Sequence, residues 1–553
     1  MRSPRACRSL LPIVLLGAVA CSHLGGRART DRHFMPKSAK PPTAFRHEWV
    51  IAPRDAVTGR EYRVAPLCGD YNSPVIERHG RIYWAYIGYW DDYDGGERAS
   101  AHHPIARRGQ SDVVHQEVYD DQSLCLAIAQ RDPLGVVIRR VIRRGVYNDA
   151  AHVVPSVGVD LDGYIHVGAN MVDRFSLAYT TLVPEGEHHD PWVYYVSRTP
   201  LDVGPGFLNR GKVGADGVRH HPPHQGVTYL NFLNDRQGRL YASYKHRLRG
   251  SWDAGTNAGG LARYHEESRT WASIGGRTCS QALDHPTLFA SAGGPGNPRH
   301  WVGVYQPYKQ SIVFDSNNRM HVSAMIYGRL GSDSHDGFTS NAVYAYSDDL
   351  GETFRRADGT SVSLPMTVTR GESADDSGLM AEGNSGVVYR THGGWSGQEL
   401  AYKVPIILTG EDPGRVTPVL RVTVKEFRFE GKSYSLVRPA EAMSLVYANH
   451  RWTEVEGIDG LNFGHGLRLR IGPFNSGFRS CLELGEGLTG ASPRVLVHRD
   501  RSSLDDCIPM GNSSRTDPAC LQQNRVLVYQ NHHVYNRRLV PGFEHGIHRV
   551  TFE

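Results

Sequence analysis

One pattern occurs four times between residues 72 and 324: a short apolar strand, a tight turn and a second apolar strand. The residues at the four turns are Gly80, Gly163, Gly238 and Asn318. Glycine and asparagine accept the positive φ that a tight hairpin turn requires, and apolar residues alternate on both sides of each turn. The sequence therefore predicts four β-hairpins of one design in a repeat architecture.

The spacing of these turns sets the size of the repeating unit. Consecutive turns are separated by 83, 75 and 80 residues. Compact propeller blades repeat every ~40 to 50 residues, so each unit must carry long loops. No helical period of any length competes with the strands. We therefore expect an all-β propeller with long loops on one face, where repeat scaffolds usually bind their ligands.

A second structural motif occupies residues 347–354, with the sequence Ser-Asp-Asp-Leu-Gly-Glu-Thr-Phe. It matches the Asp-box pattern Ser-x-Asp-x-Gly-x-Thr-aromatic. We expect Asp349 and Thr353 to tie a hairpin turn with their side chains, Gly351 to be left-handed, and Phe354 to fill the blade. The motif is structural rather than catalytic. A weaker copy spans residues 263–271.

The N-terminus has the pattern of an export signal. Arg2 and Arg5 precede an apolar run over residues 10–20, which ends at Cys21. A charged segment followed by a short apolar segment is typical of a signal peptide. Residues 18–21 resemble a bacterial lipobox, which predicts that Cys21 carries the lipid of an outer-membrane lipoprotein in the cell envelope. The alternative is an ordinary secretory signal with a chance cysteine.

The first 21 residues would then be the signal peptide, and residues 22–45, which are polar and aperiodic, a tether. The propeller would occupy residues 46–553. Without Cys7 and the lipidated Cys21, six cysteines remain, an even number in an oxidising compartment. Cys507 and Cys520 bracket a turn-rich loop and are the best candidates for a disulfide.

No cofactor is predicted, although a structural metal ion remains open. The chain contains no Cys-x-x-Cys pair, and histidines beside prolines more often rim a loop than bind metal. The net charge of +5 is spread without a basic block, so nothing indicates binding to nucleic acid. Only 8 of the 62 basic residues are lysine, and arginine binds carboxylates and sulfates through two parallel hydrogen bonds. That composition suits an acidic ligand.

Taken together, the hairpin copies, the Asp box and the pair Thr228 and Tyr229 resemble the family of BNR-repeat-containing proteins. Members with known activity include ulvan lyases and related propeller enzymes that act on rhamnosyl-glucuronate linkages. The resemblance implies a seven-bladed propeller, and residues 46–553 would give about 73 residues per blade. Residues 460–553 would form either the final blade or an appendage.

The resemblance also implies a set of catalytic residues. The lyases place a histidine before the second hairpin, where this chain has His152, and use the tyrosine of a Thr-Tyr pair, here Tyr229. A basic residue closes the same hairpin and corresponds to Lys245, and a tyrosine ahead of the next hairpin corresponds to Tyr308. Substrate-binding candidates nearby are Arg247, Arg329 and His224.

These residues imply a polysaccharide lyase that cleaves a uronic-acid-containing polymer by β-elimination. His152 would be the base, Tyr229 the acid, and Lys245 with Arg247 would neutralise the uronate carboxylate. Two other functions remain open. A surface glycan-binding lipoprotein is favoured by residues 170–173, which lack the second histidine of many lyases. A rhamnosidase-type hydrolase could act at the same linkage.

Overall fold

The structure is a computed structural model, which describes only part of the chain. The described residues are 45–52, 54–64, 75–94, 124–144, 155–169, 193–211, 218, 220–222, 227–247, 257–276, 286–291, 306–315, 317–329, 337–370, 380–381, 387–390, 398–400, 406–409, 417–430, 433–455, 460–462, 467–474, 477–484, 525–530 and 546–552. Within these ranges the strands form seven sheets, and the one helix has four residues. This helix, the one helix among the described residues, is not long and apolar enough to cross a membrane.

Four successive sheets each begin with one of the predicted hairpins and pair their strands in chain order. The first sheet contains β2 (Val75–Arg78), β3 (Arg81–Tyr89), β4 (Leu124–Arg131) and β5 (Val137–Arg144), with α1 (Asp91–Asp94) after β3. The second contains β6 (Ser156–Val159), β7 (Ile165–Ala169), β8 (Val193–Thr199) and β9 (Asp202–Asn209). The third contains β10 (Val227–Asn234), β11 (Leu240–Arg247), β12 (Asn257–His265) and β13 (Thr270–Ile274). The fourth contains β15 (Gln306–Phe314), β16 (Met320–Arg329), β17 (Gly337–Ser347) and β18 (Phe354–Arg355).

Shorter strands extend the third and fourth sheets. The third gains β14 (Phe289–Ser291), β20 (Met366–Arg370) and β21 (Met380–Ala381), and the fourth gains β19 (Ser361–Val362) and β22 (Val387–Arg390). Strands β14 and β20 pair in parallel, whereas the other strand pairs are antiparallel.

The remaining strands form three further sheets. The fifth contains β23 (Gln398–Leu400), β24 (Ile406–Thr409), β25 (Thr417–Glu430), β26 (Ser433–Ala448) and β27 (Arg451–Val455), and the sixth contains β28 (Gly460–Asn462), β29 (Leu467–Phe474) and β30 (Gly477–Leu484). In the seventh, β1 (Phe45–Ile51) pairs with β32 (Gly546–Phe552), which pairs with β31 (Arg525–Gln530). A strand from near each end of the chain therefore lies in one sheet.

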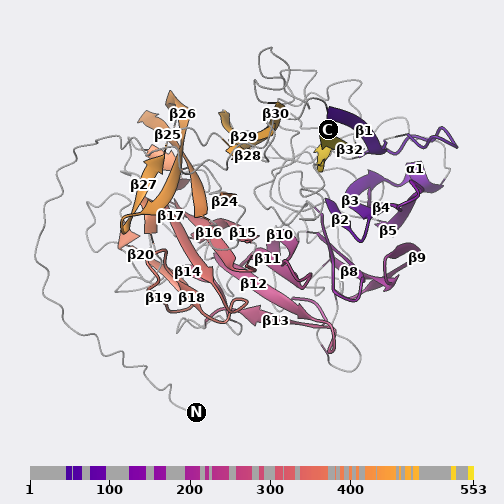
Figure 1. Ribbon diagram of the computed structural model, residues 1–553, viewed down its shortest axis with the longest axis horizontal. Coiled ribbons are helices and arrows are strands. Elements are labelled where there is room, and N and C mark those ends of the chain that lie inside the picture. Colours follow the sequence, from indigo (N-terminus) through magenta and orange to yellow (C-terminus); the bar gives the residue numbers. More distant parts are fainter. Residues whose placement is uncertain are drawn as a thin grey trace, which may run out of the picture.

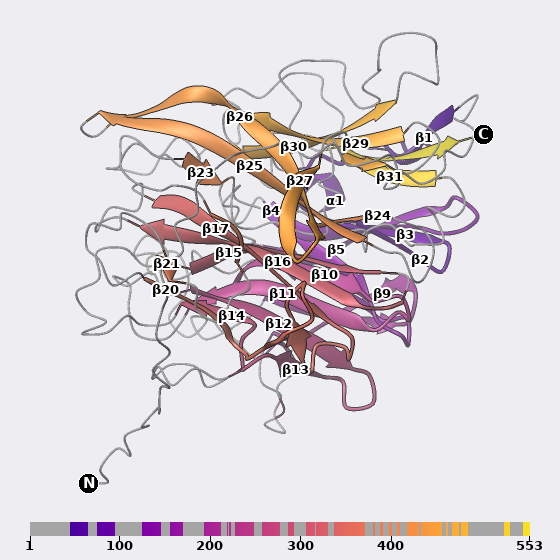
Figure 2. The same ribbon diagram turned by 60° about the vertical axis from the view of Figure 1, so that its left-hand side comes forward.

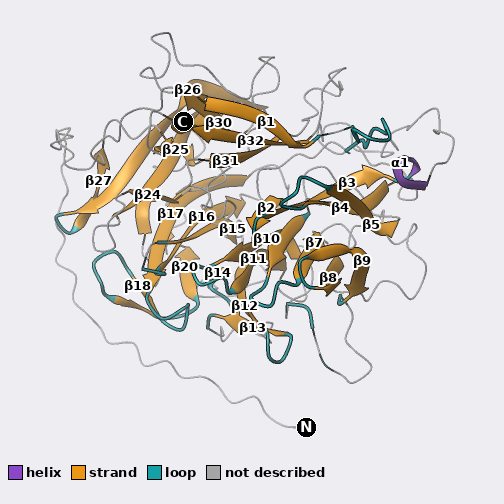
Figure 3. Ribbon diagram, turned by 45° about the vertical axis from the view of Figure 1, so that its right-hand side comes forward, coloured by secondary structure: helices purple, strands orange, loops and turns teal. Residues whose placement is uncertain are grey.

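The sheets follow one another around the molecule in chain order (Figure 1). Figure 2 shows them fanned from β25 and β26 through β15–β17 to β10–β12, and Figure 3 shows that strands dominate the described chain. Apolar side chains fill the layers between adjacent sheets: one cluster joins the first and second sheets, one the second and third, and one the third and fourth. Radial layers of this kind are typical of a propeller, so the all-β, propeller-like fold is confirmed.

The four predicted turns are present. Their central residues all have positive φ, 71° at Gly80, 87° at Gly163, 94° at Gly238 and 64° at Asn318. The turns also meet in space, because the Asn318 side chain accepts a hydrogen bond from the backbone N–H of Arg236 at 2.8 Å. A β-carbon at Gly238 would collide with the side chain of Arg78, beside the turn at Gly80, and would crowd the side chain of Leu161, in the turn at Gly163. We call the side of the molecule that carries these turns the turn face.

A buried acid begins each turn, and a histidine or tyrosine follows six residues later. In the second sheet, the Nε2 of His166 lies 3.0 Å from a carboxylate oxygen of Asp160, and its Nδ1 lies 2.6 Å from the hydroxyl of Tyr194. The fourth sheet repeats this arrangement with Asp315, His321 and Tyr344. These histidines are fully buried structural groups, and we did not anticipate this regularity from the sequence.

The Asp box adopts the predicted conformation. The carboxylate of Asp349 accepts hydrogen bonds from the backbone N–H of Thr353 at 2.8 Å and from its hydroxyl at 2.6 Å. The Ser347 hydroxyl accepts a bond from the N–H of Gly351, whose φ is 97°. Phe354 is completely buried. The motif is therefore a locally tied turn with an aromatic plug, as expected.

Two predictions about cysteines have different outcomes. Cys125 in β4 is a buried free thiol, so the even cysteine count does not translate into disulfides throughout the chain. Burial raises the pKa of this thiol to about 12, which keeps it protonated and unreactive. Cys21, Cys507 and Cys520 lie outside the described residues, and lipidation and the disulfide remain predictions.

The buried acid Asp315 makes stability depend on pH. Burial alone would raise the pKa of Asp315, but hydrogen bonds from His321 and from the backbone N–H groups of Arg319 and Asn317 outweigh it and hold that pKa below its usual value. A carboxyl whose pKa is lower in the folded state stabilises the fold above its unfolded pKa, and this contribution is lost as the pH falls further. We expect the urea midpoint to fall below about pH 4.

The matched variant for this experiment is Asp315→Asn, which keeps the size of the side chain and cannot titrate. Its urea midpoint should be lower than that of the wild type at neutral pH, and it should change less between about pH 5 and pH 3. Parallel acid profiles for the two proteins would contradict a role for Asp315 in the acid sensitivity.

Candidate active site

The sequence-predicted site residues are described to different extents. The side chains of Tyr229 and Lys245 are described. Arg247, Tyr308 and Arg329 lie in strands β11, β15 and β16, and for these three residues only the backbone is described. His152 and His224 lie outside the described residues, so the convergence of the complete set is untested.

Tyr229 occupies a β-bulge near the start of β10. Thr228 pairs with Lys245 and Asn231 pairs with Ser243, so Tyr229 and Leu230 together oppose a single residue of β11. Tyr229 also has a φ of 55°, in the left-handed region that a tyrosine seldom adopts. Bulges commonly re-aim a side chain beside an active site, and backbone strain is concentrated at functional sites. The sequence contained no signal for this bulge.

Lys245 and Tyr229 form a pair across the hairpin. The ammonium nitrogen of Lys245 lies 4.9 Å from the centre of the Tyr229 ring, within cation–π distance. The tyrosine is buried, with 6% of its surface exposed, whereas Lys245 is half-buried. The predicted acid and the predicted carboxylate-neutralising cation are thus in direct contact.

The next sheet brings a second tyrosine to a comparable position. Strand β15 carries a register shift between Pro307 and Gln310, and this irregularity contains Tyr308. The side-chain amide of Gln310 donates to the backbone oxygens of Tyr244 at 2.9 Å and of Gly260 at 3.2 Å. These bonds fix the middle of β15 beside the middle of β11, at the residue before Lys245.

All five of these candidate residues lie at the same end of their hairpins. Strands β10 and β15 begin there and β11 and β16 end there, whereas the tight turns lie at the opposite end. We call this side the loop face. The backbones of the described candidates therefore lie on the loop face, in the third and fourth sheets, and their convergence in one site stays a prediction. The five described candidates are Tyr229, Lys245, Arg247, Tyr308 and Arg329.

The first sheet adds a group of arginines and aromatics on the loop face that we did not predict. Arg63 forms an ion pair with Asp92 at 2.8 Å, and its guanidinium lies 4.7 Å from the ring centre of Tyr89, at the end of β3. Arg144 lies 4.8 Å from the ring centre of Trp90. In the sequence, the aromatic and acidic residues at 89–93 could have indicated this group, but the arginines that contact them come from distant segments.

Within the described ranges, no three His, Cys, Asp or Glu side chains come together in a way that could hold a metal ion. The polar atoms of the described site are those of a tyrosine, a lysine and an amide. This set suits acid–base chemistry and the binding of a carboxylate.

Comparison with known proteins finds a similar fold in solved structures. One crystal structure, of the polysaccharide lyase Uly1, aligns with a TM-score of 0.51 and 11% sequence identity, covering 92% of this chain and 98% of that one. A structure of a PL25 ulvan lyase aligns with a TM-score of 0.45 and 13% identity, covering 91% and 88% of the two chains. No curated protein matches the sequence.

The structural similarity to Uly1 shows a shared fold, and at 11% sequence identity it does not show a shared activity. The sequence family described as BNR repeat-containing family member matches residues 84–387, which is more than half of the chain. That match covers the second, third and fourth hairpins, the Asp box, and both Tyr229 and Lys245. The chain belongs to the BNR repeat-containing family.

Proposed function

We propose that this protein is a polysaccharide lyase that cleaves a uronic-acid-containing polymer by β-elimination at the loop face. The observation that carries the proposal is the contact between the Lys245 ammonium and the Tyr229 ring at a strained bulge. The polysaccharide lyase Uly1, which shares the fold, supports the same class of reaction.

Elimination from a uronate places specific demands on a site. The C5–H bond breaks and its proton goes to a base, a C4–C5 double bond forms, and the C4–O bond breaks as an acid protonates the leaving oxygen. The C5 proton is very weakly acidic, so negative charge that spreads into the neighbouring carboxylate must be stabilised. Preorganised cations can supply several kcal/mol of this stabilisation.

The proposed roles follow from these demands. Lys245, with Arg247, neutralises the carboxylate, and Tyr229 beside it protonates the leaving oxygen. His152 is the proposed base, because a neutral imidazole accepts protons near pH 7. Tyr308 hydrogen-bonds the substrate from the neighbouring sheet. Arg329 and His224 would bind further sugar units.

The proposal includes the architecture that carries the site. We infer that the seven sheets are the seven blades of a ring over residues 46–553. The pairing of β1 with β32 supports closure of the ring through a blade made from both ends of the chain. On this reading residues 460–553 complete the ring. Small-angle scattering that required an appendage outside a compact ring would contradict this.

A glycan-binding protein without catalytic activity is the second candidate. The burial of Tyr229 favours it, because a side chain with 6% of its surface exposed needs rearrangement to reach a leaving oxygen. One experiment separates the candidates: incubate the purified protein with uronic acid polysaccharides and follow ultraviolet absorbance and reducing ends. Rising absorbance at the unsaturated-uronate band identifies a lyase, reducing ends alone identify a hydrolase of the rhamnosidase type, and binding alone identifies the glycan-binding protein.

Substitution of Lys245 tests its role in neutralising charge. Lys245→Ala should lower kcat/KM for the acidic polymer by about 100-fold, because a preorganised charge is lost from the transition state. Lys245→Arg should retain much more activity, since the positive charge remains. Arg356→Ala, at a half-buried arginine beyond the Asp box, is the matched control. Equal activity of Lys245→Ala and the control would contradict the assignment.

A further inference from the structure

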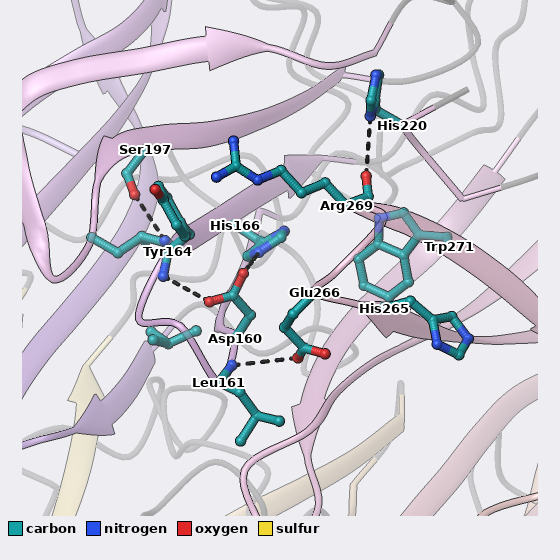
Figure 4. A network of polar contacts seen from close by, with 12 residues as sticks. Asp160, Leu161, Tyr164, His166, Ser197, His220, His265, Glu266, Arg269 and Trp271 are labelled. Atoms are coloured by element: carbon teal, nitrogen blue, oxygen red, sulfur yellow. Dashed lines mark hydrogen bonds and ion pairs between the residues drawn. The ribbon is translucent and has the colours of Figure 1, made fainter. Parts of the chain in front are cut away.

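A polar pocket lies between the second and third sheets, and neither Tyr229 nor Lys245 lines it. It is built from the β6–β7 turn, strands β8 and β9, the residue His220 and the β12–β13 turn (Figure 4). Both turns belong to the turn face. These two turns lie at the opposite end of the hairpins from the candidate active site. The lining residues that matter here are Tyr164, Arg198, Arg210, His220, Glu266 and Arg269.

The charges of this pocket leave arginines available for a ligand. Within the described part of the chain, Arg198, Arg210 and Arg269 form no ion pair with a carboxylate. The acids of the pocket are more fully occupied. Asp160 contacts His166 and accepts the N–H of Tyr164 at 2.7 Å, and Glu266 accepts the N–H of Leu161 at 3.5 Å. The lining thus holds three guanidinium groups and three carboxylates, of which Asp160 and Glu266 are already hydrogen-bonded and Asp162 is exposed. An anionic group would meet three guanidinium groups that no described carboxylate pairs with.

The pocket also has an aromatic wall held in place by the fold. The Arg269 guanidinium lies 5.3 Å from the centre of the Tyr164 ring, and Figure 4 shows its side chain extending toward that ring. Arg269 has a φ of 52°, and its backbone oxygen lies 3.0 Å from the Nδ1 of His220. This contact ties the β12–β13 turn to the segment before β10. Tyr194 and Tyr264 line the pocket as buried phenols, and burial raises the pKa of both, which keeps them neutral.

We propose that this pocket is a second, non-catalytic binding site for an acidic sugar unit. The carboxylate or sulfate of the sugar would lie against Arg198 and Arg210, and its apolar face would stack on Tyr164 beside Arg269. Guanidinium groups bind carboxylates and sulfates through paired hydrogen bonds, and aromatic rings offer a flat surface to a pyranose. The choice of ligand rests on the proposed function, because it assumes that the polymer is acidic. A site on the turn face would hold a distant part of the polymer that the loop face cleaves.

Calorimetry on full-length protein tests this site. The parent protein carries Tyr229→Phe and Lys245→Ala, which remove turnover and weaken binding at the loop face. The probe is a glucuronate-containing tetrasaccharide. Adding Arg198→Ala with Arg210→Ala should weaken the remaining binding at least tenfold, whereas the matched pair Arg355→Ala with Arg356→Ala, on the fourth sheet, should leave it unchanged. Near-ultraviolet circular dichroism checks that each protein is folded.

Three outcomes would overturn the inference: unchanged tetrasaccharide affinity after loss of Arg198 and Arg210, equal affinity for a neutral glucose tetrasaccharide, or equal affinity for inorganic sulfate alone. The proposed function is tested separately. With the loop face intact, Arg198→Ala with Arg210→Ala should preserve kcat on a short acidic substrate, whereas Tyr229→Phe should lower it by roughly 100-fold or more. Absence of cleavage by every protein would refute the lyase proposal and leave the binding result standing.

Discussion

Replacing Tyr229 with phenylalanine should lower the rate of uronate elimination by roughly 100-fold or more, because general acid catalysis typically contributes 10²- to 10⁴-fold. The substitution removes a single hydroxyl and preserves the ring that packs against Lys245. The bulge and the cation–π contact should therefore persist, and the binding of substrate should change little. The loss should appear in kcat rather than in KM, because the proton is transferred only in the transition state.

The matched control is Tyr346→Phe, at a half-buried tyrosine near the Asp box whose ring also lies under a cation, Arg319, at 4.5 Å. Its elimination rate should equal that of the wild type. If Tyr229→Phe also kept the wild-type rate, Tyr229 would be a packing residue, and the glycan-binding function would become the better account.

Truncation of Phe354 to alanine should destabilise the protein by about 3–5 kcal/mol, the usual cost of removing a buried phenyl ring from a core. Phe354 is completely buried at the end of the Asp box and belongs to the apolar cluster between the third and fourth sheets. Its neighbours in that cluster include Ile274 and Val362. The loss should lower the urea midpoint of unfolding.

Phe354→Leu should cost clearly less than Phe354→Ala, because most of the cavity stays filled. Leu134→Ala is the surface control: this side chain is 89% exposed, so its removal should change the stability by no more than about 0.5 kcal/mol. A Phe354→Ala protein as stable as the Leu134→Ala protein would contradict the role of the Asp-box aromatic as a structural plug.

The parts of the fold that the sequence predicted are those that local interactions determine. The left-handed conformation of Gly163 and Gly238 follows from the absence of a β-carbon, and the tied turn at Asp349 follows from side-chain bonds that span four residues. Such features need no knowledge of the rest of the chain. The contact between Lys245 and Tyr229 could also be predicted from the sequence, because both residues belong to one hairpin.

The features that escaped prediction depend on distant segments. The ion pair between Arg63 and Asp92 joins a segment before the first sheet to helix α1. The contact of β1 with β32 joins residues some five hundred positions apart, and no local pattern selects that partner. The bulge at Tyr229 is a matter of register between strands, which alternation of apolar residues cannot reveal.

The central claim is that the loop face cleaves an acidic polymer by elimination. Mass spectrometry of products formed in water labelled with heavy oxygen tests it most directly. Elimination predicts fragments with an unsaturated uronate at the new non-reducing end and no label incorporated by bond cleavage, and it predicts that Tyr229→Phe suppresses them. Saturated fragments that carry one labelled oxygen at the cleaved bond would instead show hydrolysis and contradict the proposed function.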